Sequence, residues 1–244
     1  MNFGMKSTVG PSETSAATYP TTLRNVDLRG PAGRLEALLN EGAPDSRYAA
    51  LVCHPHPLGG GTLHNKVVYH AMKVLNGHDW GFRLPVLRFN FRGTGLSEGH
   101  HEGVAESADV SAALDWLYSE FNLPVIVVGF SFGAAMSLVA SCGSNPAPRA
   151  NIHALAALGL PTQGFGHQFR YPFLAACKLP KLFLSGDRDW FAPRADLQQV
   201  VDSAADPKQL VFISGADHSF TGNLESMQQS LAAWLAVHIK EQVQ

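Results

Sequence analysis

The chain has 244 residues, of which 45% are apolar, and its 18 lysines and arginines nearly balance its 20 aspartates and glutamates. This length is sufficient for one α/β domain with a large buried core, and the apolar content is ordinary for a soluble globular protein. Because the basic residues are scattered, we expect no binding to nucleic acid or to an anionic membrane surface.

The N-terminal segment 1–20 is rich in Ser, Thr, Ala and Gly and contains no apolar block of the length that a secretory signal needs. We expect it to be a flexible tail, followed by a single domain over 21–244. No apolar run reaches the roughly 18 residues of a membrane span, so the expected location is the cytoplasm. The three cysteines match neither a zinc site nor a C-x-x-C motif, and we predict that they are buried thiols in a reducing compartment: Cys53, Cys142 and Cys177.

The first half of the chain alternates between strand and helix patterns. Apolar alternation predicts a hairpin formed by 23–28 and 33–39, and then a short buried strand over 48–53. Helix-compatible spacing follows at 65–75 and at 104–118, with a strand over 85–90 between these two segments. This is the order expected when crossover helices connect parallel strands.

The second half continues in the same way. The sequence predicts strands over 124–128, 154–160, 181–185 and 209–214, with helices after the first of them, over 194–204 and over 223–240. Such alternation predicts an α/β fold, with a mostly parallel central sheet and helices on both faces. Ligands of such sheets bind at the carboxyl ends of the strands, so the loops that follow each strand are the places to look for a site.

A serine stands at the corner of a strand-turn-helix pattern in the middle of the chain. The sequence Gly129-Phe130-Ser131-Phe132-Gly133 joins the β-branched run before it to a run of small residues after it. A turn this tight forces its central residue toward positive φ and leaves room only for glycine two positions before and after. Since 23 glycines can produce this pattern by chance, its interpretation as a nucleophile elbow depends on a base and a carboxylate downstream.

Both partners lie downstream, in loops that follow predicted strands. His218 comes after the last strand, and Asp187 and Asp189 come after the strand before it. Because the carboxyl ends of parallel strands meet at one edge of the sheet, we expect His218 to be the general base for Ser131. Either aspartate could orient the histidine. Asp187 is the nearer to its strand, where a short side chain readily binds backbone N–H groups, so we favour Asp189.

An oxyanion hole for acyl transfer needs two backbone N–H groups, one of them from the residue after the nucleophile. Phe132 supplies the first. The second is expected from the loop His54-Pro55-His56-Pro57-Leu58-Gly59-Gly60-Gly61, which follows an early buried strand. Proline has no N–H, so the donor is His56 or Leu58, and we favour His56.

Two other loops have alternative interpretations. His54 and His56 are spaced like some metal ligands, but no acidic or thiol ligand lies nearby in the sequence, and we expect no metal. The glycine-rich loop after residue 91 lacks the motifs of a phosphate or dinucleotide cradle, so we expect a structural loop anchored by Arg92. His100 and His101, a little further on, are expected to be solvated.

Several motifs together resemble one family. The motifs are G-F-S-F-G at 129–133, R-G-T-G-L-S at 92–97, G-D-R-D-W-F-A-P at 186–193 and D-H-S-F at 217–220. On these motifs the chain resembles the α/β-hydrolase family from about residue 23 to its last helix. The opening H-P-H-P-L-G-G-G at 54–61 looks like that of small bacterial serine hydrolases that lack a lid. The resemblance implies an α/β-hydrolase fold without a cap domain, with Ser131 as nucleophile, His218 as general base and acid, and Asp189 as the orienting carboxylate. His54-Pro55 stands where the family more often has His-Gly, which leaves the loop donor open.

A serine at the elbow favours acyl transfer, and the expected activity is that of a carboxylesterase acting on small, short-acyl esters without a cofactor. Thioesterase or acyltransferase activity with the same three residues is an alternative, and so is a non-catalytic binding protein on a hydrolase scaffold. The segment 161–180 is too short for a cap domain. Its aromatic residues either wall an acyl pocket or pack on the sheet. The candidate pocket residues are Leu58, Phe165, Phe169 and Phe191.

Overall fold

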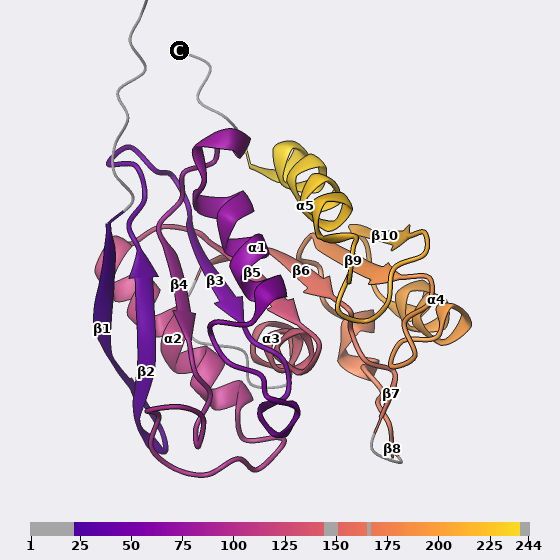
Figure 1. The fold of residues 1–244 in the computed structure, drawn as a ribbon, viewed down its shortest axis with the longest axis horizontal. Helices are drawn as coiled ribbons and strands as arrows, with labels where there is room; N and C mark the ends of the chain where they lie inside the picture. The colour runs from indigo at the N-terminus through magenta and orange to yellow at the C-terminus, as the bar shows by residue number, and fades with distance from the viewer. Residues whose placement is uncertain (1–21, 144–150, 165–166, 240–244) are drawn as a thin grey trace, which may run out of the picture.

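The computed structural model describes residues 22–143, 151–164 and 167–239, so the predicted tail 1–20 lies outside the described residues. Figure 1 shows a twisted sheet with helices against both of its faces. Eight strands form this sheet in the order β1-β2-β4-β3-β5-β6-β9-β10. Strand β2 pairs antiparallel with β1 and with β4, and all other pairs in this sheet are parallel. The predicted mostly parallel sheet is confirmed.

The strands lie close to the predicted segments. Those of the main sheet are β1 (Leu23–Gly30), β2 (Gly33–Asn40), β3 (Ala49–Cys53), β4 (Val86–Phe89), β5 (Val125–Phe130), β6 (Ile152–Leu158), β9 (Lys181–Gly186) and β10 (Lys208–Ile213). Strand β5 lies in the middle of the sheet and is buried along its whole length. This burial on both faces explains why its sequence is a continuous apolar run rather than an alternating one.

The helices also match the predicted segments, with shifts at their ends. They are α1 (Lys66–Asn76), α2 (Ser107–Phe121), α3 (Phe132–Cys142), α4 (Arg194–Ser203) and α5 (Leu224–His238), and short 3-10 turns cover Pro57–Gly59, His78–Trp80 and Pro172–Ala175. The largest shift is at α2, which begins three residues later than predicted. The side chain of Glu106 accepts hydrogen bonds from the N–H groups of Glu102 and Gly103 there, so these residues form a turn before the helix.

The sheet separates two apolar clusters. Helices α1 and α5 pack on one face and enclose the cluster that contains Val128, Leu184 and Trp234. Helices α2, α3 and α4 pack on the other face, around the cluster that contains Val127, Phe183 and Leu197. In Figure 1, α1 and α5 lie in front of the sheet and α2 lies behind it. The carboxyl ends of the parallel strands are thus left as the edge where loops from distant parts of the chain meet.

The connection between β6 and β9 is short, as predicted. Its described part contains a small antiparallel pair, β7 (Gln163–Gly164) and β8 (His167–Gln168), and the 3-10 turn at Pro172–Ala175. The pair β7-β8 was not predicted, because two-residue strands carry no periodicity that a sequence pattern can register. Within the three described ranges, no helix is both long and apolar enough to pass through a membrane.

The prediction of three thiols is wrong for two of the cysteines. Cys142 and Cys177 form a disulfide. Although 35 positions separate them in the sequence, their Cα atoms lie 5.4 Å apart; Cys142 ends α3, and Cys177 follows the 3-10 turn at Pro172–Ala175. Sequence spacing does not report such proximity. Cys53 is a free and buried thiol, as predicted, and burial raises its pKa to about 12.

Candidate active site

Ser131 occupies the corner between β5 and α3. Its backbone has φ 54° and ψ −118°, a conformation that costs energy for any residue with a Cβ and that the surrounding structure must hold in place. The N–H of Ser131 donates to Leu158 O at 2.8 Å, which ties the corner to the end of the neighbouring strand β6. The side chain is mostly buried but lines a cavity. The predicted positive φ at this serine is confirmed.

The two glycines of the motif are required by close backbone contacts. A Cβ added at Gly129 would lie 2.4 Å from the carbonyl oxygen of Gly133, across the turn. A Cβ added at Gly133 would lie 2.5 Å from the carbonyl oxygens of both Cys53 and His54, at the end of β3. Contacts this short exclude any side chain. The glycines therefore let α3 start directly above the sheet and beside the loop that follows β3.

His218 reaches Ser131 from the loop after β10. Its Nε2 lies 2.9 Å from Ser131 Oγ, and its Nδ1 lies 2.8 Å from Asp189 Oδ2. A carboxylate only accepts hydrogen bonds, so Nδ1 carries the hydrogen and Nε2 offers its lone pair to the serine hydroxyl. The ring packs between Phe130 and Phe191, with centroid distances of 5.2 Å and 4.6 Å. These contacts hold the imidazole at the orientation that proton transfer from Ser131 requires.

The carboxylate of Asp189 is fully buried, and both of its oxygens accept hydrogen bonds. Oδ2 accepts hydrogen bonds from His218 and from Ser185 Oγ at 3.0 Å, and Oδ1 accepts from the N–H groups of Phe191 and Ala192. Asp187, the other candidate, instead accepts the N–H of Gly215 at 2.7 Å, in the loop that also carries His218. The structure thus brings Asp189, and not Asp187, to the histidine.

The candidate oxyanion donors, Phe132 and His56, both line the cavity next to Ser131. Phe132 begins α3, where the first N–H groups of a helix have no partner within the helix. In the loop after β3, His56 lines the cavity, whereas the N–H of Leu58 donates to His56 Nδ1 at 3.2 Å. The N–H of Leu58 is therefore occupied in this structure, and the assignment of His56 as the loop donor stays a prediction.

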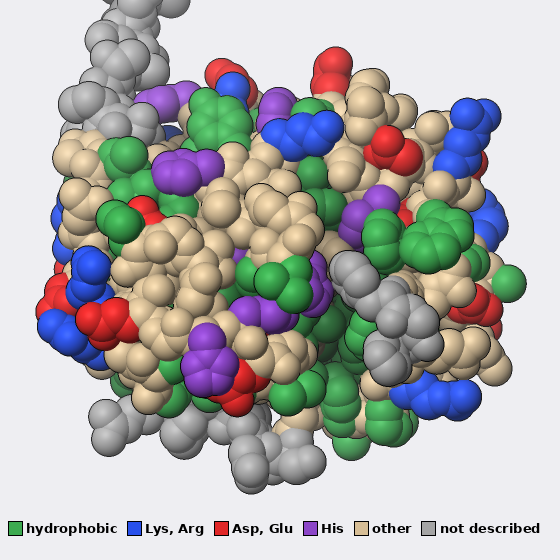
Figure 2. Space-filling view, turned by 60° about the horizontal axis from the view of Figure 1, so that its bottom comes forward, with side chains coloured by type: hydrophobic (Ala, Val, Ile, Leu, Met, Phe, Trp, Pro, Cys, Tyr) green, Lys and Arg blue, Asp and Glu red, His purple; other side chains and the backbone are tan. Residues whose placement is uncertain are grey.

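A cavity of about 500 Å³ opens beside Ser131 and His218. Figure 2 shows it as a hollow with hydrophobic side chains in and around it and histidines at its edge. Of the predicted pocket residues, Phe169 and Phe191 line the cavity, and Phe165 lies outside the described residues. Leu58 is not among the lining residues. It is 80% exposed, because the 3-10 turn that holds its N–H against His56 directs its side chain to solvent.

The aromatic segment before β9 contributes to the cavity as well as to the core. Tyr171 and Phe173 line the cavity together with Phe169, and Tyr171 is also part of the core cluster around α3. The disulfide from Cys142 to Cys177 ties the end of α3 to the end of this segment. The two interpretations that the sequence left open, pocket wall and packing on the sheet, therefore both apply to these residues.

His54 anchors the start of the candidate oxyanion loop from inside the protein. Its ring is fully buried, and its Nδ1 lies 2.7 Å from Pro55 O while its Nε2 accepts the N–H of Phe91 at 3.0 Å. Burial lowers the pKa of His54 to about 4. A neutral imidazole with this tautomer satisfies both bonds, so His54 connects β3 and its loop to the end of β4.

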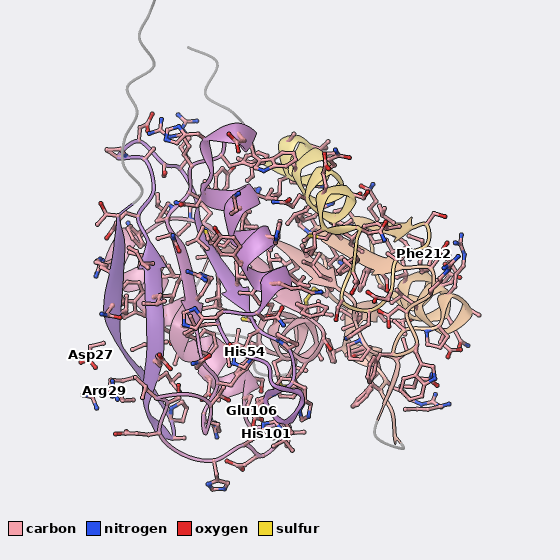
Figure 3. The ribbon with its side chains drawn as sticks, in the orientation of Figure 1. Asp27, Arg29, His54, His101, Glu106 and Phe212 are labelled. Carbon is pink, nitrogen blue, oxygen red and sulfur yellow. A yellow bond between two sulfur atoms is a disulfide. The ribbon has the colours of Figure 1, made fainter. Side chains whose placement is uncertain are left out.

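A second pair of a histidine and a carboxylate lies beside the loop, where sequence reasoning predicted a solvated His101. Figure 3 shows His101 and Glu106 next to each other below His54, and His101 Nδ1 lies 2.7 Å from Glu106 Oε1. The His101 side chain is 12% exposed and Glu106 is fully buried. Burial opposes ionisation of Glu106, but hydrogen bonds from backbone N–H groups and the nearby His101 bring its pKa below the ordinary value. The neighbouring His100 is exposed, as predicted.

The ring of His101 packs against both candidate donors of the oxyanion hole. Its centroid lies 4.7 Å from that of His56 and 5.4 Å from that of Phe132, and His56 and Phe132 are 5.0 Å apart. Burial, and secondarily His101, lower the pKa of His56. Periodicity and motif could not reveal this cluster, because its rings come from two separate loops and from the first residue of α3. The one available signal was the glutamate at position 106, directly before α2.

No group of three or more His, Cys, Asp or Glu side chains in the described ranges is arranged to hold a metal ion. Arg92 was predicted to anchor the glycine-rich loop. Its guanidinium lies 2.7 Å from the carboxylate of Asp109 and 3.1 Å from that of Glu102. Arg92 thereby fixes the glycine-rich loop after β4 to the first turn of α2. That loop continues into Gly103 and Val104, which line the cavity.

Residues 79–242 match the model of a family described as an alpha/beta hydrolase domain. The match covers more than half of the chain and includes the nucleophile corner, the aspartate loop and the histidine loop. The chain belongs to the α/β-hydrolase family.

Related proteins extend the match over nearly the whole chain. An uncharacterized protein of Rickettsia prowazekii is 36% identical over an alignment 223 residues long, which covers 85% of this chain and 87% of that protein. A serine hydrolase without lid from Xanthomonas campestris has a similar structure, with a TM-score of 0.77, 27% identity, and 92% and 98% of the two chains covered. An alpha-beta serine hydrolase homologue from Coxiella burnetii has a TM-score of 0.75 and 31% identity, over 90% of this chain and 100% of that one.

Proposed function

We propose that the protein hydrolyses carboxylic esters through an acyl-enzyme on Ser131, with His218 as general base and acid and Asp189 as the orienting carboxylate. The observation that carries the proposal is the chain of contacts from Asp189 through His218 to Ser131, at 2.8 Å and 2.9 Å, which ends in an apolar cavity. The structural relatives described as serine hydrolases support the same assignment.

In the first half of the proposed reaction, Ser131 Oγ attacks the ester carbonyl carbon while its proton passes to His218 Nε2. The imidazolium that forms is stabilised by Asp189, whose negative charge lies 2.8 Å from Nδ1. The carbonyl oxygen becomes negative and accepts hydrogen bonds from the N–H of Phe132 and, as proposed, of His56. The intermediate then collapses, the alcohol leaves with the proton from Nε2, and the acyl group stays on Ser131.

In the second half, water replaces the alcohol. His218 Nε2 takes a proton from the water as it attacks the acyl carbon, and the proton returns to Ser131 Oγ when the carboxylic acid departs. The cavity opens at the surface in Figure 2, and Val104 and Phe169, which line it, are exposed. Access of water to the acyl-enzyme supports hydrolysis over transfer to another acceptor.

The proposal is tested with p-nitrophenyl acetate, an acetyl thioester of similar size, and an added alcohol acceptor. We expect release of nitrophenolate, an acetyl group on Ser131 by mass spectrometry when the reaction is quenched early, and acetate as the final product. A higher kcat/KM for the thioester would favour a thioesterase, and transfer to the alcohol would favour an acyltransferase. Absence of turnover and of any adduct on Ser131 would contradict the proposal and favour a binding protein.

A further inference from the structure

One face of helix α3 forms an apolar floor that leads away from Ser131. Phe132, Ala135, Met136 and Val139 all line the cavity. Spacings of three, four and seven residues place them on the same side of the helix. At 1.5 Å of rise per residue, Val139 lies about 12 Å along the helix from Ser131. An acetyl group on Ser131 would cover only the start of this floor.

The rest of the lining is mostly uncharged. Aromatic rings of Phe169, Tyr171, Phe173 and Phe191 contribute to it, and the hydroxyl of Tyr171 donates to Pro161 O at 2.7 Å, so its polar end is already satisfied. Among the described lining residues, Arg170 alone is a lysine, arginine, aspartate or glutamate, and it is exposed. An apolar group is therefore the ligand chemistry that the floor and the aromatic rings fit.

Exposed apolar side chains surround the opening. Val104 is 74% exposed and lines the cavity, as does the partly exposed Phe169. Leu58 and Trp190, at 80% and 66% exposure, are each next in sequence to a cavity-lining residue. Figure 2 shows hydrophobic side chains at the surface around the hollow. Exposed apolar side chains gathered at one place are typical of a binding surface.

We propose that the substrates are esters whose acyl part is an uncharged, medium-length alkyl chain, which lies along α3 and reaches the apolar rim. This inference rests on the proposed ester hydrolysis at Ser131, and it replaces the short acyl group expected from the sequence. The acyl part is assigned to the floor because the leaving alcohol oxygen must take its proton from His218 Nε2, so the alcohol lies on the histidine side. The acyl chain then extends from Ser131 along the helix.

The test measures kcat/KM for p-nitrophenyl acetate, butyrate, octanoate and dodecanoate, all below the concentration at which they aggregate. Each methylene that becomes buried should raise kcat/KM by up to about fourfold, so octanoate should exceed acetate by at least about tenfold. A second series keeps the acetyl group and lengthens the alcohol, and here we expect a change of less than about threefold, because the alcohol does not lie on the floor.

Two variants examine the floor and the rim, with one matched control. Ala135→Phe fills the middle of the floor and should lower the octanoate-to-acetate ratio at least about tenfold, whereas Val104→Ser at the rim should lower it about twofold to threefold. Val237→Ser is the control, since Val237 is 77% exposed on α5, of which no described residue lines the cavity. It should leave the ratio unchanged. Melting temperatures show whether Ala135→Phe folds, and Val104→Ser decides the question if it does not.

A wild-type protein that hydrolyses acetate at Ser131, but shows a flat or falling series with acyl length, would overturn this inference and leave the proposed function intact. A dependence on alcohol length alone, a preference for chains that end in a carboxylate, or an equal response of Val104→Ser and Val237→Ser would overturn it as well. Failure to hydrolyse any ester, or activity that persists in Ser131→Ala, would instead contradict the proposed function itself.

Discussion

Two pairs of a histidine and a carboxylate lie near the turn that contains Ser131, and they differ in what the histidine reaches. His218 lies 2.8 Å from Asp189 and His101 lies 2.7 Å from Glu106, and both carboxylates are fully buried. The far nitrogen of His218 lies 2.9 Å from Ser131 Oγ. The ring of His101 instead packs on aromatic rings, those of His56 and Phe132.

A histidine that lies beside a buried carboxylate is not a general base for that reason alone. A general base must reach the proton that it removes, and only His218 offers a nitrogen to the serine hydroxyl. His101 can act on the reaction only through the positions of His56 and Phe132, which carry the candidate oxyanion donors. As part of the proposed function we assign the first pair to proton transfer, and we infer that the second pair positions the candidate oxyanion donors.

The largest effect is expected from the residues that share the proton. Ser131→Ala and His218→Ala should each lower kcat by a factor of about 10⁴ or more, and the double variant should be hardly worse, because attack needs both groups at once. Steady-state kinetics on p-nitrophenyl acetate measures this. Losses that multiply in the double variant would break the assignment of these residues to one proton transfer.

The second largest effect is expected at Asp189, whereas the same substitution at Asp187, in the same loop, should have little effect on kcat. Asp189→Asn should lower kcat by about 10³ to 10⁴, because an amide that replaces the buried carboxylate no longer holds the histidine in the required tautomer. Asp187→Asn keeps an oxygen that can accept the N–H of Gly215, so it should cost about 1 kcal/mol of stability or less and leave kcat within about threefold. Measuring kcat and melting temperature for both variants checks this. A larger catalytic loss for Asp187→Asn would reverse the assignment.

His54 provides a buried histidine with no carboxylate partner for comparison. Its pKa is about 4 in the folded protein against an ordinary 6.5, so between these values the unfolded chain binds the proton and the folded protein does not. The stabilisation is complete above about pH 6.5 and is lost as the pH falls toward 4, and about 2 kcal/mol of it is gone at pH 5. Urea unfolding at pH 7.5 and pH 5 should show this loss in the wild type.

The control for this prediction is a pair of matched variants. His54→Gln removes the titrating ring and should reduce the difference in unfolding free energy between the two pH values by about 2 kcal/mol. His100→Gln, at an exposed position, should leave that difference unchanged. An equal pH dependence in wild type and His54→Gln would contradict the assignment of the titration to His54.

The smallest effect is expected from the second pair. Glu106→Gln and His101→Phe should lower kcat about threefold to tenfold with little change in KM, because the oxyanion donors are needed most in the transition state. His101→Phe keeps a ring against His56 and Phe132, so it should be the milder variant. His101→Ala, which removes the ring, should be the more severe one. A loss of 10³ or more for Glu106→Gln would place this pair in proton transfer and break the comparison.

Much of the fold could be predicted because its signals are local. The buried runs of parallel strands, the helix spacing between them and the two glycines around Ser131 are all properties of short segments. The same logic predicted that His218 and Asp189 project from neighbouring strand ends, and the structure places Asp189 against His218 and His218 against Ser131. Pro55 and Pro57 likewise narrowed the loop donor to two residues, because a proline has no N–H to donate.

The rest depends on contacts that no local pattern reports. The disulfide joins Cys142, at the end of α3, to Cys177, which lies before β9, and the mostly buried His101 packs against rings from another loop and from α3. The lining of the cavity combines ordinary helix positions, such as Ala135, with aromatic residues from a separate segment. Leu58 shows the reverse case, since an apolar residue within a site loop was predicted to line the pocket and is exposed.

The most direct test of the central claim is the rate at which a fluorophosphonate probe labels the protein, because labelling needs an activated serine and no knowledge of the substrate. Mass spectrometry of the labelled peptide should place the probe on Ser131 in the wild type. Labelling should be slowed at least about 10³-fold in His218→Ala and less than about tenfold in His101→Ala. Equal labelling of wild type and His218→Ala, or a probe attached at another residue, would contradict the account.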